Sequence, residues 1–309
     1  NTAALVYGDV DVFQYGAILI ARYSQGLPSS GMIFGCNNVN GTPKGHVRVG
    51  VYKTTETTGQ QRSNAENRKT NNESDHTYEM AAVFGGGNQA AYIPDNLTTG
   101  STEVFINGCD DVSIHSVYGG GNAASTPATL VTIQGAYEIE YVFGGGNGAG
   151  TGNPGANVGY HAYNAGDTAI GGPSDEAKAA RQRYAYGSGK AKTQIYGGRL
   201  HKVFGGSNTL GNVREATVAM LDEISDCQLV LDGIYGGGKS AYMEGNAEIE
   251  LGCVSGLDEI YGGAEQADVG KSIVLTLTSG HYNKVYGGNN LGGKILGSIT
   301  VNIEQTGCL

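Results

Sequence analysis

Side chains that can exchange protons recur at one fixed position in this chain, three residues before an aromatic residue. That position is held by Ala81, His115, Glu140, His201, Asp232, Asp258 and Asn283. Glu140, His201 and Asp232 could act with the nearby Arg199 and Lys202. Such a group would abstract a proton from a sugar while a cation stabilises a carboxylate. The other interpretation is a solvated polar edge that resists association between sheets. We favour the polar edge and keep the five residues as catalytic candidates.

Aromatic residues form a second periodic set, each preceded by Val or Ile and followed by two glycines. Its members are Phe84, Tyr118, Phe143, Phe204, Tyr235, Tyr261 and Tyr286. Stacked rings would stabilise neighbouring repeats by about 0.5–1.5 kcal/mol per pair. Alternatively, the rings could form an exposed stripe on which sugars stack, and Tyr118 is the ligand-binding candidate from this set. We favour internal stacking.

A further group of ligand-binding candidates lies in one long irregular segment. Aromatic and cationic side chains concentrate there, and loops on a rigid scaffold often carry binding residues. The candidates are Tyr160, His161, Tyr163, Arg181 and Tyr184.

Motifs for other chemistries are missing from the sequence. The five cysteines form no CxxC pair and have no Cys/His metal spacing, and an odd, sparse set does not indicate a disulfide scaffold. The glycine runs are not followed by GKS or GKT, and Gly-x-Ser-x-Gly is absent. We therefore expect no metal and no cofactor.

Composition narrows the class of protein. Gly accounts for 53 of 309 residues, while there are only six Pro, so neither a collagen nor a helical bundle fits. The net charge of −10 disfavours a nucleic-acid partner because it repels phosphates. A transmembrane helix needs about 20 consecutive apolar residues, and the sequence contains no such run.

Internal repeats decide the predicted fold. The motif V-[FY]-G-G-G-N begins at Val83 and returns, with variations, to Val285, and its aromatic residues are 25 to 61 residues apart. Short alternating strands precede most copies, for example Val131 with Ile133, and Ile273 with Leu275. Units of about 25 residues that cannot bury a face alone must stack. The sequence therefore predicts an all-β, right-handed parallel β-helix, the handedness following from the rule for parallel crossovers.

Asparagine recurs four residues after most of the aromatic positions, in Asn38, Asn88, Asn122, Asn147, Asn208 and Asn290. Stacked strands lie about 4.8 Å apart, so these side chains are expected to form an amide ladder. The glycines are expected to supply positive φ at a corner and to let backbones approach closely.

The predicted boundaries divide the chain into two parts. Residues 1–32 form N-terminal strands or a capping coil, and residues 33–309 form the coils, which end partway through a coil. Polar insertions are expected at 53–77 and 148–190, and the capping and charge pattern predicts a short helix near 174–185.

The repeated V-[FY]-G-G-G-N units resemble the glycine-rich β-helix repeats of secreted and surface proteins of gut Bacteroidetes, and more broadly the pectin-lyase-like β-helices. The resemblance covers about 33–303 and implies an extracellular or cell-surface location. It transfers no catalytic residue. We expect a non-catalytic binding or adhesion scaffold for glycans or host ligands, monomeric or part of a longer chain. The alternative is a carbohydrate-active enzyme, either a polysaccharide lyase or a glycosidase.

Overall fold

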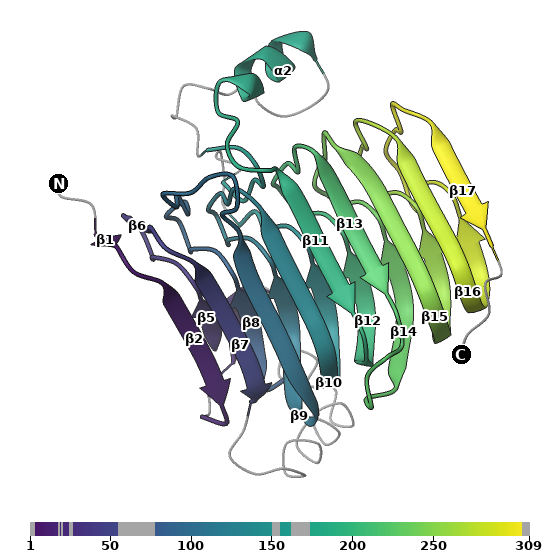
Figure 1. The fold of residues 1–309 in the computed structure, drawn as a ribbon, viewed down its shortest axis with the longest axis horizontal. Helices are drawn as coiled ribbons and strands as arrows, with labels where there is room; N and C mark the ends of the chain where they lie inside the picture. The colour runs from purple at the N-terminus through teal and green to yellow at the C-terminus, as the bar shows by residue number, and fades with distance from the viewer. Residues whose placement is uncertain are drawn as a thin grey trace.

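The protein is built almost entirely of β-strands, most of them parallel (Figure 1). The computed structural model describes residues 4–17, 19, 21–24, 27–54, 78–149, 155–161 and 174–304. One helix, α2 (Asp175–Gln182), occurs in this part of the chain, within the predicted range 174–185, and it lies apart from the strands (Figure 1). This eight-residue helix is too short to cross a bilayer.

A first row of parallel strands runs the length of the molecule. In spatial order it contains β2 (Val10–Tyr15), β7 (Val47–Lys53), the first halves of β9 (Thr102–Tyr118) and β10 (Thr129–Phe143), β11 (Lys190–Ile195), β13 (Ala216–Leu221), the first halves of β15 (Asn246–Tyr261) and β16 (Ile273–Tyr286), and β17 (Ile299–Ile303). Each strand pairs with the equivalent strand of the next repeat, so equivalent side chains become neighbours.

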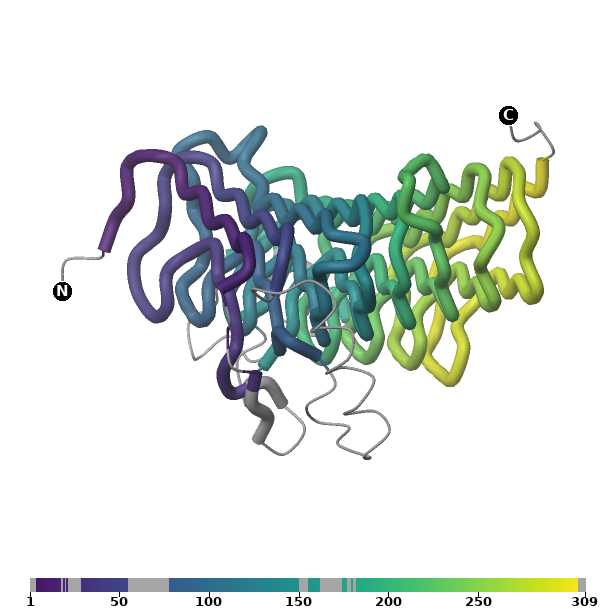
Figure 2. The backbone as a smooth tube through the Cα atoms, turned by 90° about the horizontal axis from the view of Figure 1, so that it is seen from below, coloured from purple at the N-terminus to yellow at the C-terminus, as the bar shows by residue number. Residues whose placement is uncertain are grey.

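A second row of parallel strands carries the glycine motifs. It contains β5 (Met32–Phe34), β8 (Met80–Phe84), the second halves of β9 and β10, β12 (Gly198–Phe204), β14 (Leu229–Tyr235), and the second halves of β15 and β16. The register aligns Phe34, Phe84, Tyr118 and the later aromatic residues in one column. Figure 2 shows the successive repeats side by side along the molecule.

Shorter elements complete each repeat. The two-residue strands β1 (Leu5–Val6) and β6 (Thr42–Pro43) pair in parallel, and single bridges join Val158 to Val213 and Val269 to Ile295. An antiparallel pair, β3 (Arg22–Ser24) with β4 (Leu27–Ser30), lies near the N-terminus. Residues 155–161 lie inside the predicted insertion 148–190, yet Val158 pairs with the neighbouring repeats. Residues 55–77 of the other predicted insertion are outside the described residues.

The core lies between the two rows. Alternate residues of the first row, such as Val49, Ile106 and Ile133, are buried against residues of the second row such as Ile114 and Ile139. Burying a side chain of this size contributes about 1.5–3 kcal/mol. The period of two predicted from the sequence therefore places one face of each strand in the core.

The periodic aromatic residues form the predicted internal column, called the aromatic stack below. Phe34, Phe84, Tyr118, Phe143, Phe204, Tyr235, Tyr261 and Tyr286 form a continuous series of stacked rings. The ring centroids of Phe84 and Tyr118 are 4.7 Å apart, close to the strand spacing. The spacing of the strands thus sets the spacing of the rings.

The asparagine ladder is confirmed over five members. Each side-chain amide donates to the amide oxygen of the preceding asparagine at 2.8 Å, from Asn208 back through Asn147, Asn122 and Asn88 to Asn38. Asn290 instead donates to the hydroxyl of Tyr235, because Lys239 and Glu265 hold the two intervening ladder positions.

Of the two roles expected of the motif glycines, close backbone approach is confirmed and positive φ is not. A side chain at Gly119 would place its Cβ 2.4 Å from the carbonyl oxygen of Gly144, so close backbone approach requires glycine there. The expected positive φ is wrong, because the described glycines with positive φ, such as Gly148 and Gly198, lie outside the motif positions. Strand spacing, and not a left-handed corner, excludes side chains from the motif.

Candidate functional site

An exposed group of aromatic side chains lies on the outer face of the first row, near the N-terminal end. We call Phe13, Tyr15, Tyr52 and Phe105 the aromatic patch. Each alternates with core residues along β2, β7 or β9, so strand geometry points these rings away from the core. The side chains of Phe13 and Tyr15 are 45% and 68% exposed. Adjacent exposed apolar side chains on one face are typical of binding surfaces, whereas single ones are common.

The rings of the aromatic patch contact one another. Tyr15 and Tyr52 stack with centroids 4.9 Å apart, and Tyr52 lies 6.3 Å from Phe13 and 6.0 Å from Phe105. Because each ring restrains its neighbour, the patch is ordered before any ligand arrives. Such preorganisation reduces the entropic cost of binding.

Gly50 lets the rings of the aromatic patch lie close against the strand. It pairs with Phe13 on one side and with Phe105 on the other. A Cβ at Gly50 would lie 2.7 Å from Cδ1 of Phe13 and 3.0 Å from Cε2 of Tyr52. A cavity of about 270 Å³ opens beside it, lined by three of the four rings, Phe13, Tyr52 and Phe105, and by Arg48, Glu103, Leu130 and Thr132. Its size suits one or two small rings.

Polar groups border the aromatic patch. The Arg48 guanidinium Nε lies 3.4 Å from a carboxylate oxygen of Asp11 and 4.0 Å from one of Glu103. All three side chains are about half exposed. Two carboxylates around one cation offer hydrogen bonds to hydroxyl groups and disfavour an anionic ligand. Flat apolar rings and hydrogen-bonding groups therefore lie side by side on this outer face.

The catalytic candidates Glu140, His201 and Asp232 are neighbours on the outer face of the second row. Nδ1 of His201 lies 2.6 Å from Asp232, and Nε2 lies 3.0 Å from Glu138. The hydroxyl of Tyr78 donates to the carboxylate of Glu140. The register predicted from the sequence therefore brings these three candidates together.

Glu138 is the member of this group that the sequence did not single out. It is 2% exposed although it lies on an outer face, and it is bonded to His201. The hydrogen bond to Glu138 raises the pKa of the His201 imidazole, partial burial opposes that change, and Asp232 adds to it. An imidazolium held between two carboxylates is a stable ion cluster. In the described residues, no group of three or more potential ligands is placed to hold a metal ion.

The two basic candidates do not complete a catalytic group. The Lys202 ammonium lies 2.7 Å from a carboxylate oxygen of the buried Glu265 and 5.9 Å from the centroid of the Tyr235 ring. Arg199 is exposed on β12 beside Val230 of β14. Lys202 therefore has a structural partner of its own.

The ligand candidates from the repeats and the long segment have mainly structural places. Tyr118 is 3% exposed and its ring is stacked between Phe84 and Phe143, so neither ring face can receive a sugar. Burial raises the pKa of Tyr118 to about 12.

Tyr160 is buried and its hydroxyl donates to the carboxylate of Glu244, while Tyr184 packs against it. His161 stacks on Tyr186 with centroids 4.0 Å apart. Tyr163 and the side chain of Arg181 lie outside the described residues. His161 and Tyr184 thus pack within the segment, and Tyr160 connects it to Glu244 of a later repeat.

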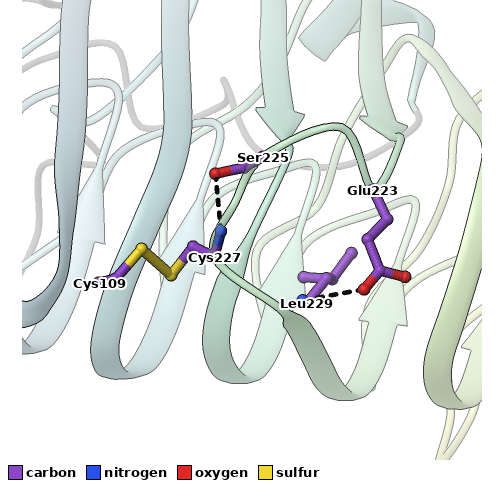
Figure 3. Close-up of a disulfide and its surroundings, with 5 residues drawn as sticks. All are labelled: Cys109, Glu223, Ser225, Cys227 and Leu229. Carbon is purple, nitrogen blue, oxygen red and sulfur yellow. Dashed lines mark hydrogen bonds between the residues drawn. A yellow bond between two sulfur atoms is a disulfide. The ribbon is translucent and has the colours of Figure 1, made fainter.

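A disulfide joins Cys109 to Cys227, a pairing that the sequence left open (Figure 3). The segment 222–228 crosses two repeats to reach Cys109. A Cβ at Gly135 would lie 2.8 Å from the sulfur of Cys227, and one at Gly197 would lie 2.2 Å from its carbonyl oxygen. Glycines under the crossing segment therefore leave room for it. Because Cys109 and Cys227 are 118 residues apart in sequence, no local spacing indicated that they pair.

The remaining described cysteines differ in state. Cys253 is disulfide-bonded, whereas Cys36 is a free thiol whose pKa is raised by burial. Neither contributes to the aromatic patch. Comparison of the chain with known protein families, with curated proteins and with solved structures found no match.

Proposed function

We propose that this chain is a secreted or cell-surface scaffold that binds neutral glycans at the aromatic patch. The single observation that carries the proposal is the group of contacting rings beside Gly50, two exposed and two half-buried, which lies next to a cavity and is bordered by Arg48 and two carboxylates. Aromatic faces bind the apolar faces of sugars, and the charged groups can bond to hydroxyls. The net charge of −10 disfavours acidic polysaccharides.

The scaffold in this proposal is a right-handed parallel β-helix with coils of about 25 residues. Two long rows of in-register parallel strands, a core between them and the single bridges of the third side support this assignment. The handedness follows the general rule for parallel crossovers. A rigid β-helix of this kind presents a flat outer face over many strands.

An extracellular or cell-surface location is supported by two observations. The Cys109–Cys227 disulfide is of a kind that persists in oxidising compartments. The repeats also resemble those of secreted and surface proteins of gut Bacteroidetes. On these grounds the ligand is a glycan of the surroundings or of a host surface.

A glycan array followed by calorimetry with the best neutral oligosaccharide tests the binding proposal. Tyr52→Ala should weaken binding tenfold or more, since aromatic anchors at binding sites are commonly worth about 2 kcal/mol. Tyr7→Ala is the matched control, because Tyr7 is 79% exposed and lies outside the patch. Absence of binding to every glycan would leave only a structural role and refute the proposal.

The second candidate function, a carbohydrate-active enzyme, is favoured by the His201 cluster alone. Its carboxylates and imidazole are the groups that proton transfer to or from a sugar requires. Product analysis on uronic-acid polysaccharides tests it. If the parent chain forms unsaturated products and His201→Gln does not, catalysis would replace glycan binding as the preferred function.

A further inference from the structure

Two lysine side chains project from the outer face of β11 beside a small cavity. Lys190 and Lys192 are exposed and flank the buried Ala191, so strand alternation places both on the same face. A cavity of about 180 Å³ opens beside them, and we call it the lysine pocket. Its lining also includes four residues with hydroxyl side chains, namely Thr98, Thr99, Ser101 and Ser188.

The two ammonium groups have no counter-ion in the part of the chain that the structure describes. No described carboxylate lies within ion-pair distance of Lys190 or Lys192, and none lines the lysine pocket. Glu215 of the adjoining repeat is instead paired with Arg214 at 3.3 Å and with Lys271 at 3.8 Å. The pocket is therefore positively charged, although the chain has 29 Asp and Glu against 19 Lys and Arg.

Neighbouring strands limit this positive region to the width of one small group. On one side Lys192 pairs with Leu130 of β10, which pairs with Glu103 of β9 (Figure 1). On the other side Lys192 pairs with Val218 of β13, which pairs with Glu248 of β15. An acidic residue thus lies two strands away in each direction, about 10 Å at the usual strand spacing. A polyanion laid across the strands would meet these carboxylates, whereas a single anionic group would meet only the lysines.

Two loops bring hydroxyl groups to the lysine pocket. Asn96 orders the first loop, because its side-chain oxygen accepts hydrogen bonds from the backbone N–H groups of Thr98 and Thr99. The second loop contains the exposed Ser188. Hydroxyl groups can donate to the oxygens of an anion while the ammonium groups supply the opposite charge. The pocket therefore combines charge with neutral donors.

We propose that the lysine pocket binds one oxyanion group, a sulfate or phosphate that is either free or carried by a larger ligand. One water needs only about 10–15 Å³, so a cavity of about 180 Å³ has room for such a group. The cavity beside the aromatic patch shares Leu130 with the lysine pocket but is lined by Glu103, which repels the same anion. The two sites are therefore distinct, and the inference is independent of glycan binding at the patch.

Calorimetric titration of the 309-residue chain with sodium sulfate tests the proposal, with chloride adjusted to keep the ionic strength constant. One sulfate should bind per chain, and Lys192→Gln should weaken binding about tenfold or more, because it removes a charged donor. Lys192→Arg, which keeps the charge, should retain most of the affinity. Lys294→Gln is the matched control, since it removes the same charge from an exposed lysine outside the pocket. Absence of saturable binding to the parent, or an equal loss in Lys192→Gln and Lys294→Gln, would overturn the proposal.

A sulfated monosaccharide distinguishes the two sources of the oxyanion. Tighter binding of the sulfate ester than of free sulfate indicates a group carried by a larger ligand, and equal affinities indicate the free anion. In either case Lys192→Gln should lower both affinities. The same sugar without its sulfate should not compete with free sulfate. Competition by the neutral sugar would show that the pocket recognises hydroxyl groups instead of the anion, and it would contradict the proposal.

Discussion

The aromatic stack and the aromatic patch use the same kinds of side chain for opposite purposes. In the stack, rings recur at every repeat and each ring inside the series has neighbours on both faces, so that Phe143 and Phe204 are at most 1% exposed. In the patch, rings occur in three neighbouring strands and leave edges and faces open. The difference indicates that the periodic rings stabilise the molecule, while the rings of the patch, which lie outside the period on an outer face, keep part of their surface accessible.

The largest effect on stability is expected from Phe143→Ala. It removes a fully buried ring that contacts Tyr118 and Phe204. Truncating a buried Phe costs about 3–5 kcal/mol. Chemical denaturation should show this loss, while glycan affinity at native conditions stays within error of the parent. A stability loss below about 1 kcal/mol would show that the stack contributes little.

The opposite pattern is expected from Phe105→Ala in the aromatic patch. Phe105 is half buried and contacts Tyr52 at a centroid distance of 6.0 Å, so stability should fall by only about 0.5–1.5 kcal/mol. Glycan affinity should fall about tenfold or more. Large destabilisation with unchanged affinity would reverse the roles assigned to the two aromatic groups.

Asn122→Leu should have an effect between these two on stability. Asn122 donates to Asn88 and accepts from Asn147, and the substitution removes both bonds and leaves amide groups without partners. Each lost bond costs about 0.5–1.5 kcal/mol, more where a buried partner is stranded. Asn38→Leu is the matched control, because Asn38 is exposed at the end of the ladder and accepts from Asn88 alone. If both variants melted at the same temperature as the parent, the asparagine ladder would not contribute to stability.

The smallest expected effect is the pH dependence due to His201. Its pKa is raised in the folded protein, chiefly by the hydrogen bond to Glu138. The stabilisation is therefore complete below the ordinary imidazole value of about 6.5 and is lost as the pH rises through the raised value. As the pH rises from the ordinary imidazole value through the raised pKa of His201, the difference in unfolding free energy between the parent and His201→Gln should therefore become smaller. A difference between the parent and His201→Gln that stays constant with pH would refute the cluster.

The sequence predicted the features that repeat. Alternation of Val and Ile predicted the strands that bury Val131 and Ile133, and the asparagine period predicted the bond from Asn147 to Asn122. Neighbouring repeats impose the same environment on equivalent residues, so one copy of a pattern supports the next. The outward position of Glu140 and His201 followed from the same register.

The features that do not repeat escaped prediction for physical reasons. Phe13, Tyr52 and Phe105 are 39 and 53 residues apart in sequence, and only strand pairing brings them together. Their signal was still present, because Tyr52 and Phe105 alternate with buried β-branched residues and Phe13 follows the inward-facing Val12, so all three had to face outward. The pairing of Cys109 with Cys227 left no such signal, since the segment 222–228 crosses two repeats outside the periodic register.

Footprinting of the protein with and without its best-binding neutral oligosaccharide tests the central claim most directly. Carbene labelling reports the accessible side chains, so bound glycan should protect Tyr15, Tyr52 and Phe105 while labelling of α2 and of Tyr286 is unchanged. The matched comparison is an acidic oligosaccharide of equal length, which should protect none of these residues. Protection confined to the His201 cluster, or to the segment 155–161, would contradict glycan binding at the aromatic patch.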